Sequence, residues 1–319
     1  MKILFYTIPF VDVHTDTLFD GLCQVVGSEN IDDYPHKPLL HEHIEMRYPS
    51  SYTYPVNRTD AEKLDLLRNG QYDLVIAAVR PIRAIVHAVR RDPLEASIKA
   101  LDIIVKNNLK NTPIVLVDGC DMTYLEQLAI DITNPLIYFK REYHPDVEYP
   151  DFVKPLSLSL SNSLCPSDIS GPRENRIFWA GKWTDTRRPF LTLVNAYNYH
   201  KSYDQYCLIL KSVQIGLSLW GYGQDTVRYY EVPAMGALLL AQRTTIKLDH
   251  AFEDGKTAVL FDTTEEMMEK LKYCLSNPEY TDKIRLAGHA WLHKYHTASA
   301  RAKQLLAKVK KQQNLNKKI

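Results

Sequence analysis

An arginine and a glutamate stand three residues apart in the stretch GYGQDTVRYYEVPAMGALLLAQ. This spacing places Arg228 and Glu231 on one face of a short helix. A guanidinium there can hold two phosphate oxygens, and a carboxylate one turn later can accept hydrogen bonds from two ribose hydroxyls. Gly221 and Gly223 would let the backbone approach such a ligand. The helix is expected to start near Thr226 with Asp225 or Thr226 as its cap, and its first amides favour an anion. The pattern predicts a site for a nucleoside diphosphate; the alternative is a surface pair between Arg228 and Glu231.

Acidic residues and a histidine follow two apolar runs in the first half of the chain. Asp12 and His14 come after the run KILFYTI, and Asp118 ends the run PIVLVDG. Ligands of parallel sheets bind near the carboxyl ends of strands, so these three residues are candidates for a general base. Helix capping and turn closure are the alternative roles for each of them.

Histidines gather in HEHIEMRYP, where His41 and His43 precede Glu45 and His36 lies nearby. Alternating residues in a loop fix no ligand geometry, so we predict a surface loop here. No paired-aspartate D-x-D stretch stands in a plausible loop. The sequence therefore predicts no metal site.

The composition is typical of a globular chain of one or two domains. The 319 residues carry a formal net charge of +1, with 45 % apolar and 24 % charged residues. This charge gives no electrostatic argument for a nucleic-acid or membrane partner, and no apolar run reaches the ~18 residues of a membrane span. The five cysteines are scattered without CxxC spacing, which predicts reduced thiols and a cytoplasmic location.

Strand-like and helix-like segments alternate along the chain, which predicts an α/β fold with doubly wound parallel sheets. Region 143–175, rich in proline and serine, interrupts this rhythm and reads as a connection between domains. Strands are expected at 2–8, 72–79, 112–119, 135–142, 176–181, 214–221, 237–241 and 252–261. Helices are expected at 60–70, 93–108, 123–130, 187–199, around 228–231, at 263–278 and in two further segments after it.

The C-terminal third resembles group 1 glycosyltransferases, in the branch related to the spore-maturation protein CgeB. The family reads roughly R-x-x-E-x-x-A-x-G-x-x-L-L, then F-x-D-G-x-E, then a helix pair and H-T-x-x-x-R. The similarity is strong from Arg228 to Leu306 and extends weakly back to FWAGKWTDTRRPF. Matching positions are Arg228, Glu231, Ala234, Gly236, Asp254, Gly255, His296, Thr297 and Arg301.

The resemblance implies a GT-B architecture, in which two Rossmann-like domains face a cleft and the second holds most of the sugar nucleotide. Residues 1–160 would form the acceptor-side domain, 161–300 the nucleotide-sugar domain, and 301–319 a C-terminal helix and basic tail. The resemblance also gives Gly181 a backbone contact with the donor. It gives Lys182 and one of the arginines in TDTRRPF, Arg187 foremost, contacts with the diphosphate; a solvated basic turn is the alternative.

Two positions depart from the family pattern. Lys256 precedes Thr257, where the family often has an acidic residue. Many group 1 enzymes also carry a glutamate eight residues before the one that matches Glu231, and Gly223 stands there in this chain. A role of that earlier glutamate in holding the donor sugar therefore does not transfer, and the identity of the sugar stays open.

The resemblance and the residues together predict a hexosyltransferase that moves a sugar from a nucleoside diphosphate to an acceptor hydroxyl. Lys182, Arg187 and Arg228 would stabilise the leaving diphosphate, so neither a metal nor a cofactor is expected. The family suggests retention of configuration, with the departing phosphate as proton acceptor. The acceptor, whether glycan, protein, lipid or nucleic acid, is open. The alternatives are an exostosin-like transferase, whose motif also pairs arginine with glutamate before A-x-G, and a non-catalytic nucleotide-sugar-binding module.

Overall fold

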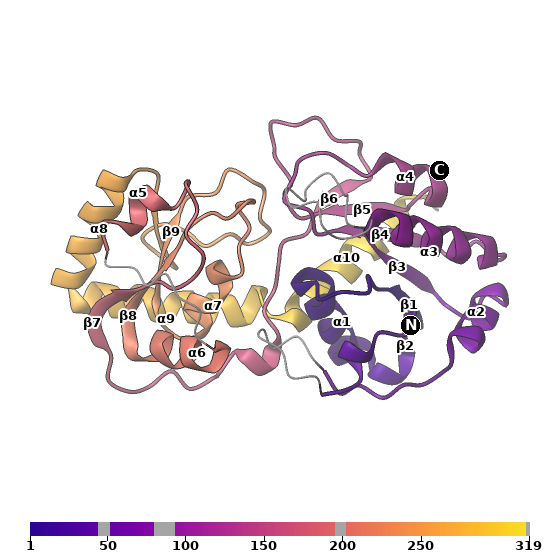
Figure 1. The fold of residues 1–319 in the computed structure, drawn as a ribbon, viewed down its shortest axis with the longest axis horizontal. Coiled ribbons are helices and arrows are strands. Elements are labelled where there is room, and N and C mark those ends of the chain that lie inside the picture. Colours follow the sequence, from indigo (N-terminus) through magenta and orange to yellow (C-terminus); the bar gives the residue numbers. More distant parts are fainter. Residues whose placement is uncertain (44–51, 80–92, 195–201, 317–319) are drawn as a thin grey trace.

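The computed structural model describes residues 1–43, 52–79, 93–194 and 202–316. Two parallel β-sheets lie in separate halves of the molecule, one built from residues 3–155 and the other from residues 174–261 (Figure 1). Helices pack against both sheets, as the alternation of apolar runs and helical segments predicts. The α/β fold class is confirmed.

The first sheet has the strand order β2-β1-β3-β4-β5-β6, and all neighbours are parallel. Successive side chains of a strand point to opposite faces, so Ile3 and Phe5 pack in one apolar cluster and Leu4 and Tyr6 in another. The strands are β1 (Ile3–Tyr6), β2 (Ile31–Tyr34), β3 (Leu74–Val79), β4 (Ile114–Asp118), β5 (Ile137–Lys140) and β6 (Val153–Pro155). The helices are α1 (Val13–Val26), α2 (Asp60–Arg68), α3 (Pro93–Asn107) and α4 (Gln127–Thr133).

The second sheet has the order β10-β9-β8-β7 and is also parallel. Leu238 and Leu240 of β9 pack on one face, and Leu239 and Ala241 pack on the other. The strands are β7 (Glu174–Phe178), β8 (Val213–Ser218), β9 (Leu238–Gln242) and β10 (Val259–Phe261). The helices are α5 (Arg188–Leu191), α6 (Tyr203–Ser212), α7 (Arg228–Ala234), α8 (Thr264–Ser276), α9 (Pro278–Tyr295) and α10 (Ala298–Asn316). Within the described ranges, no helix is both long and apolar enough to cross a membrane.

Several elements were not expected from the sequence. Helix α1 contains threonines and Gly21, which are weak helix formers, and tertiary packing holds it. Strand β2 reads IDDY, and its buried aspartates pair with cations that lie far along the chain. Strand β6 lies inside the expected connection 143–175 and joins the first sheet. Of the helix expected at 187–199, α5 covers the beginning, and residues 195–199 lie outside the described ranges.

The C-terminal helix returns to the first sheet. Helix α9 packs against the second sheet, whereas α10 lies against α1 on the other half of the molecule (Figure 1). A bridge between Leu160 and Thr297 joins the two crossing segments. The buried guanidinium of Arg301 donates to the carbonyl of Leu158 at 3.0 Å. The chain therefore crosses between the halves twice, and the two crossings hold each other.

Candidate functional site

Two arginine side chains meet at the carboxyl ends of β7 and β8. Arg228 is the first residue of α7, and Arg187 directly precedes α5. Their guanidinium carbons lie 5.2 Å and 5.9 Å from the ring centroid of the buried Trp179. The negative face of an indole ring stabilises a nearby cation. Trp179 therefore helps to hold two like charges close together.

Backbone carbonyls fix the direction of each guanidinium. Arg228 Nε donates to the carbonyl of Ala180 at 3.0 Å. Arg187 Nε donates to the carbonyl of Trp220 at 2.6 Å, and its Nη1 donates to that of Lys182 at 3.1 Å. A guanidinium has five N–H donors in a planar fork. Each arginine therefore keeps donors for a further acceptor.

The charge of this arginine pair is not balanced locally. Across the parts of the chain that the structure describes, neither Arg187 nor Arg228 forms an ion pair with a carboxylate. Arg187 is 8 % exposed, and burial together with the charge of Arg228 lowers its pKa to about 10. Arg187 stays protonated at neutral pH. Sheltered charges of one sign are unfavourable without an opposite partner, so the pair suits an anion with several oxygens, such as a diphosphate.

Gly181 makes the position of Arg228 possible. A Cβ atom at residue 181 would lie 2.1 Å from Nη2 of Arg228, and a Cβ atom at Gly221 would lie 3.2 Å from Nη2 of Arg187. A side chain at Gly181 would push the guanidinium out of the site. The structure therefore brings together the predicted donor-site residues Gly181, Arg187 and Arg228, with Lys182 exposed beside them.

Glu231 lies one helical turn after Arg228 and is 4 % exposed. It is a hydrogen-bond neighbour of Tyr206 in α6, and burial followed by the Glu231 charge raises the pKa of that phenol. The alternative of an exposed Arg228–Glu231 surface pair is wrong, because this carboxylate is inside the protein. A buried carboxylate needs hydrogen-bond donors, and ribose hydroxyls are donors of the predicted kind.

A carboxylate that follows a strand of the first sheet is hydrogen-bonded to the loop between β8 and α7. Glu142, two residues after β5, accepts hydrogen bonds from the amides of Gln224 and Asp225 at 3.1 Å and 2.9 Å. A Cβ atom at Gly223 would lie 2.4 Å from Glu142 Oε1, so the glycine leaves room for this carboxylate. The structure thus places Gly223 at a contact between the two halves, and the neighbouring loop amides already have an anionic partner.

Helix α7 begins at Arg228, two residues after the expected start at Thr226. Asp225, one of the two expected caps, accepts instead from the amide of Leu158 and from the hydroxyl of Tyr230, both at 2.7 Å. The hydroxyl of Thr226, the other, lies 3.2 Å from that of Ser218. No side chain caps the helix. The expected cap is wrong because Leu158 and Tyr230, rather than the first amides of the helix, donate to the carboxylate of Asp225.

Asp118 forms an internal ion pair at the end of β4. It is fully buried, and its Oδ2 accepts from Lys140 Nζ and Tyr138 Oη at 2.7 Å each. Its Oδ1 accepts from the amide of Cys120 at 2.7 Å. A general base must reach the substrate hydroxyl directly or through one water. Three internal donors and complete burial favour a structural role for Asp118.

Asp12 and His14 stand where β1 leads into α1. Asp12 caps the helix, since its Oδ1 accepts from the amide of His14 at 3.0 Å. His14 is buried, and neither of its ring nitrogens has a hydrogen-bond partner among the described residues. Burial lowers the pKa of His14 to about 3; Asp12 opposes this shift, and three nearby cations add to it. Such an imidazole is a weak base at neutral pH, which leaves the half-buried Asp12 as the candidate nearest to solvent.

The second half of the chain matches a family model by sequence. Residues 152–307, which include the second sheet, α9 and part of α10, match the model described as glycosyl transferase-like. No curated protein matches the chain by sequence.

Solved structures match nearly the whole chain. An α-glucosyltransferase in complex with UDP-glucose and DNA containing an abasic site has a TM-score of 0.60 at 14 % identity, over 97 % of this chain and 99 % of that chain. Anabaena HepE in complex with UDP has a TM-score of 0.58 at 11 % identity, over 98 % and 100 %. A glycosyltransferase from Rickettsia africae ESF-5 has a TM-score of 0.61 at 8 % identity, over 98 % of each chain. The chain has the GT-B fold.

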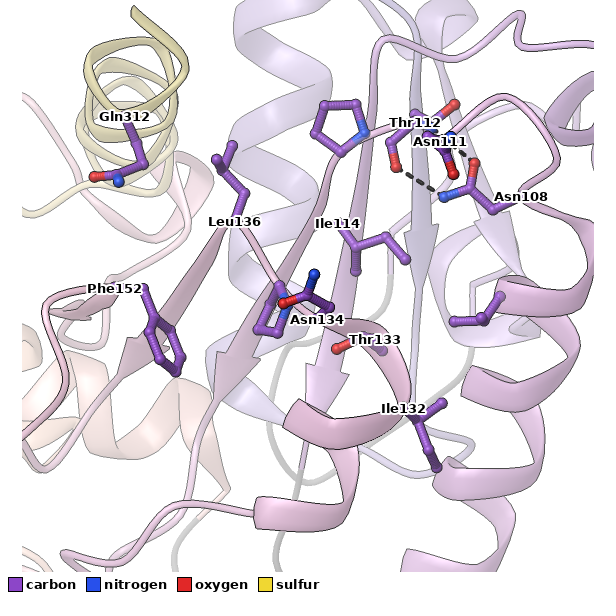
Figure 2. Close-up of a pocket in the computed structure, with 13 residues that line it drawn as sticks. Asn108, Asn111, Thr112, Ile114, Ile132, Thr133, Asn134, Leu136, Phe152 and Gln312 are labelled. Carbon is purple, nitrogen blue, oxygen red and sulfur yellow. Dashed lines mark hydrogen bonds between the residues drawn. The ribbon is translucent and has the colours of Figure 1, made fainter. Parts of the chain in front are cut away.

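A second pocket lies at the edge of the first sheet where a GT-B fold does not bind its ligand. A pocket of about 670 Å³ lies at the amino ends of β4 and β5 (Figure 2). Asn108 and Thr112 on its wall satisfy each other with two hydrogen bonds of 2.8 Å. Ligands of parallel α/β sheets bind at the carboxyl ends of the strands. This pocket is at the opposite edge of the first sheet from Asp12 and Glu142.

Glu142, Trp179 and Trp220 are site residues that the sequence patterns did not single out. The indole N–H groups of Trp179 and Trp220 are buried without an acceptor among the described residues. A weak signal existed, because FWAG and SLWG each end an apolar run with a tryptophan. Parallel neighbouring strands end at the same edge of a GT-B sheet, which would have placed both tryptophans together.

Proposed function

We propose that the protein is a glycosyltransferase that moves a sugar from a nucleoside diphosphate to an acceptor hydroxyl. The observation that carries the proposal is the pair of guanidinium groups of Arg187 and Arg228, which lie at the carboxyl edge of the second sheet without carboxylate partners in the described structure. The family match over residues 152–307 and the neighbours solved with UDP or UDP-glucose support the same reaction class.

Each donor-site residue has a distinct role in this proposal. Arg187 and Arg228 hold the diphosphate and, with Lys182, stabilise the charge that grows on it as the glycosidic bond breaks. Three cations in one place can supply the stabilisation that a metal supplies elsewhere, so we expect transfer without a divalent cation. Glu231 accepts hydrogen bonds from the ribose hydroxyls. Since neighbours of this fold are solved with UDP-glucose, we expect a UDP-hexose as donor.

We expect retention of configuration, with the leaving phosphate as proton acceptor. The first sheet favours this route because Asp118 is internally paired and His14 is a weak base. Asp12 then positions α1 and takes no proton. We place the chain in the CgeB-like branch on the motif from Arg228 to Arg301. The acceptor class is open; one neighbour is solved with DNA, but a net charge of +1 gives no electrostatic reason to prefer nucleic acid.

The donor test compares two neighbouring arginines. Arg187→Ala should weaken binding of UDP by about 10- to 100-fold, the loss expected for charge-assisted hydrogen bonds worth about 1.5–3 kcal/mol. Arg228→Ala should do the same. Arg188→Ala is the matched control, because its side chain is 67 % exposed and faces Asp185. Calorimetric titration with UDP would measure all three.

Release of UDP from a panel of UDP-sugars, with and without added acceptors, would test turnover. Slow hydrolysis that disappears in Glu231→Gln supports the enzyme. Tight binding without turnover for every donor and acceptor supports the nucleotide-sugar-binding module. Equal UDP binding in the wild type, Arg187→Ala and Arg228→Ala would refute the site itself.

A further inference from the structure

Two histidines and an aspartate come together after strand β2, at the carboxyl edge of the first sheet. His41 Nε2 lies 3.1 Å from Asp33 Oδ2, and His36 Nδ1 lies 3.8 Å from the same oxygen. The two imidazole rings stack with their centroids 4.9 Å apart. One ligand atom from each residue lies within 4.8 Å of the other two.

The ring of His41 is oriented by a backbone carbonyl. Its Nδ1 lies 2.8 Å from the carbonyl oxygen of Tyr54, which can only accept, so Nδ1 carries a hydrogen. In the neutral ring, Nε2 then presents a lone pair towards Asp33. The side chain is 5 % exposed, and Nε2 is buried without a hydrogen-bond partner among the described residues. A lone pair that faces a carboxylate is repulsive, and either a proton on Nε2 or a metal ion between the two atoms removes this repulsion.

The two distances from the histidines to Asp33 suit a zinc-sized ion. Zinc binds imidazole nitrogen and carboxylate oxygen at about 2.0–2.2 Å in tetrahedral sites, which puts neighbouring ligand atoms roughly 3.3 Å apart. The observed 3.1 Å and 3.8 Å bracket that value. His36 is 36 % exposed, so the fourth position is open to water. The bond from His41 to a backbone carbonyl is the outer contact that zinc-binding histidines usually make.

Surrounding charges do not cancel the aspartate. Lys63 Nζ lies 3.0 Å from Asp33 Oδ1, but it is shared at the same distance with Asp60. The ammonium of Lys37 points away, to Asp16 and the carbonyl of Phe10. Two carboxylates thus share one lysine. The amide of Lys37 donates to Asp33 Oδ2 at 2.6 Å and holds that oxygen towards the histidines.

We propose that Asp33, His36 and His41 form a binding site for a divalent cation of the zinc type. Imidazole nitrogen with one carboxylate favours Zn²⁺ over Mg²⁺ or Ca²⁺, which prefer all-oxygen ligand sets. The site is separate from the arginine pair of the second sheet and does not depend on the proposed function. His36 and His41 belong to the histidine group in and before HEHIEMRYP, whereas the third ligand, Asp33, lies outside it. The predicted surface loop is wrong for His41, whose side chain is 5 % exposed; Glu45 lies outside the described ranges.

A bound ion would fix the loop after β2, and Lys37 of this loop is ion-paired with Asp16 of helix α1. Lys37 lies between the two histidines and reaches Asp16 of α1. The ion would therefore stabilise the first sheet near Asp12 and would take no part in binding the diphosphate.

The experiment removes one ligand at the least buried position. Full-length protein, stripped with a chelator, should bind one Zn²⁺ per chain in competition with a chromophoric chelator. With Co²⁺ it should develop the visible absorption of a tetrahedral site. His36→Ala should weaken Zn²⁺ binding at least 10-fold and remove the Co²⁺ band. His43→Ala is the matched control, because this exposed histidine lies outside the cluster.

Asp33→Asn and His41→Ala should give the same loss, provided that circular dichroism shows them folded; His36→Ala decides the matter if they are not. Absence of Zn²⁺ binding, or equal binding in His36→Ala and His43→Ala, would overturn the proposal. UDP binding should be unchanged in His36→Ala, so the experiments test the cation site and the proposed donor site independently.

Discussion

His14 illustrates what burial does to a single side chain. Its ring is enclosed at the start of α1, and burial lowers its pKa to about 3 from an ordinary value near 6.5. Between these values the unfolded chain binds a proton that the folded chain does not, so the free energy of unfolding falls as the pH drops from about 6.5 towards 3. Residue identity suggested a base, but burial makes this imidazole a neutral packing group.

His14→Gln should remove this contribution to the pH dependence of stability. The wild type should lose up to about 1.4 kcal/mol per pH unit from this residue in the acidic window, and the variant should show a flatter curve. Urea unfolding between pH 7 and pH 4.5 measures it. His43→Gln, at an exposed position, should keep the wild-type slope. Equal slopes in the wild type and His14→Gln would show that His14 is not the buried neutral group described above.

At the scale of elements, the contact between α1 and α10 is set by one glycine. A Cβ atom at Gly21 would lie 2.0 Å from the carbonyl oxygen of Ala298, the first residue of α10. The helices are therefore closer than any side chain at this position permits. The glycine weakens the helix propensity of α1, and the close packing of α10 compensates.

Gly21→Ala should destabilise the protein even though alanine is the better helix former. Because the nearest atoms belong to the backbone of α10, relief requires that the helix move, at a cost of about 1–3 kcal/mol. Gln24→Ala, at an exposed position of the same helix, should change stability by less than about 0.5 kcal/mol. Thermal unfolding of both variants tests this, and an unchanged or raised midpoint for Gly21→Ala would contradict it.

At the scale of the whole molecule, a few polar contacts set how the two halves meet. The carboxylate of Glu142 accepts hydrogen bonds from two backbone amides of the loop before α7. The amide of Lys247 donates to the carbonyl of Tyr143 at 2.8 Å. Asp225, which supplies one of the two loop amides, also accepts from the amide of Leu158 at 2.7 Å, two residues before the crossing at Leu160. Because Glu142, just after the carboxyl end of β5, contacts the loop that leads to Arg228, any change in this contact would move the proposed donor site relative to the first sheet.

Glu142→Gln should loosen the contact between the halves. The amide side chain can accept from only one of the two loop amides and points N–H against the other, which leaves a buried donor unpaired at a cost of about 1–3 kcal/mol. We expect a lower unfolding midpoint and a larger radius of gyration in small-angle X-ray scattering. Glu148→Gln, exposed a short distance along the chain, is the control. A Glu142→Gln protein with unchanged midpoint and radius would show that this contact does not hold the halves.

From the amino-acid sequence alone, the fold class and the shared helical face of two residues of the proposed donor site could be predicted. Continuous apolar runs such as Leu74–Val79 can only be buried on both faces, and the spacing of Arg228 and Glu231 places them on one helical face whatever surrounds them. These are local properties of the chain, and local patterns record them.

Which polar groups are open to a ligand depends on contacts between residues that lie far apart along the chain. Three carboxylates near the candidate site already accept hydrogen bonds from within the protein. Asp118 accepts from Lys140, and Asp225 accepts from the amide of Leu158. Glu142 accepts from the amides of the loop that follows Gly223. Asp33, His36 and His41 came together although their spacing gives no metal motif. Partners of this kind lie far apart along the chain, so a side chain's availability depends on three-dimensional neighbours that residue spacing does not encode.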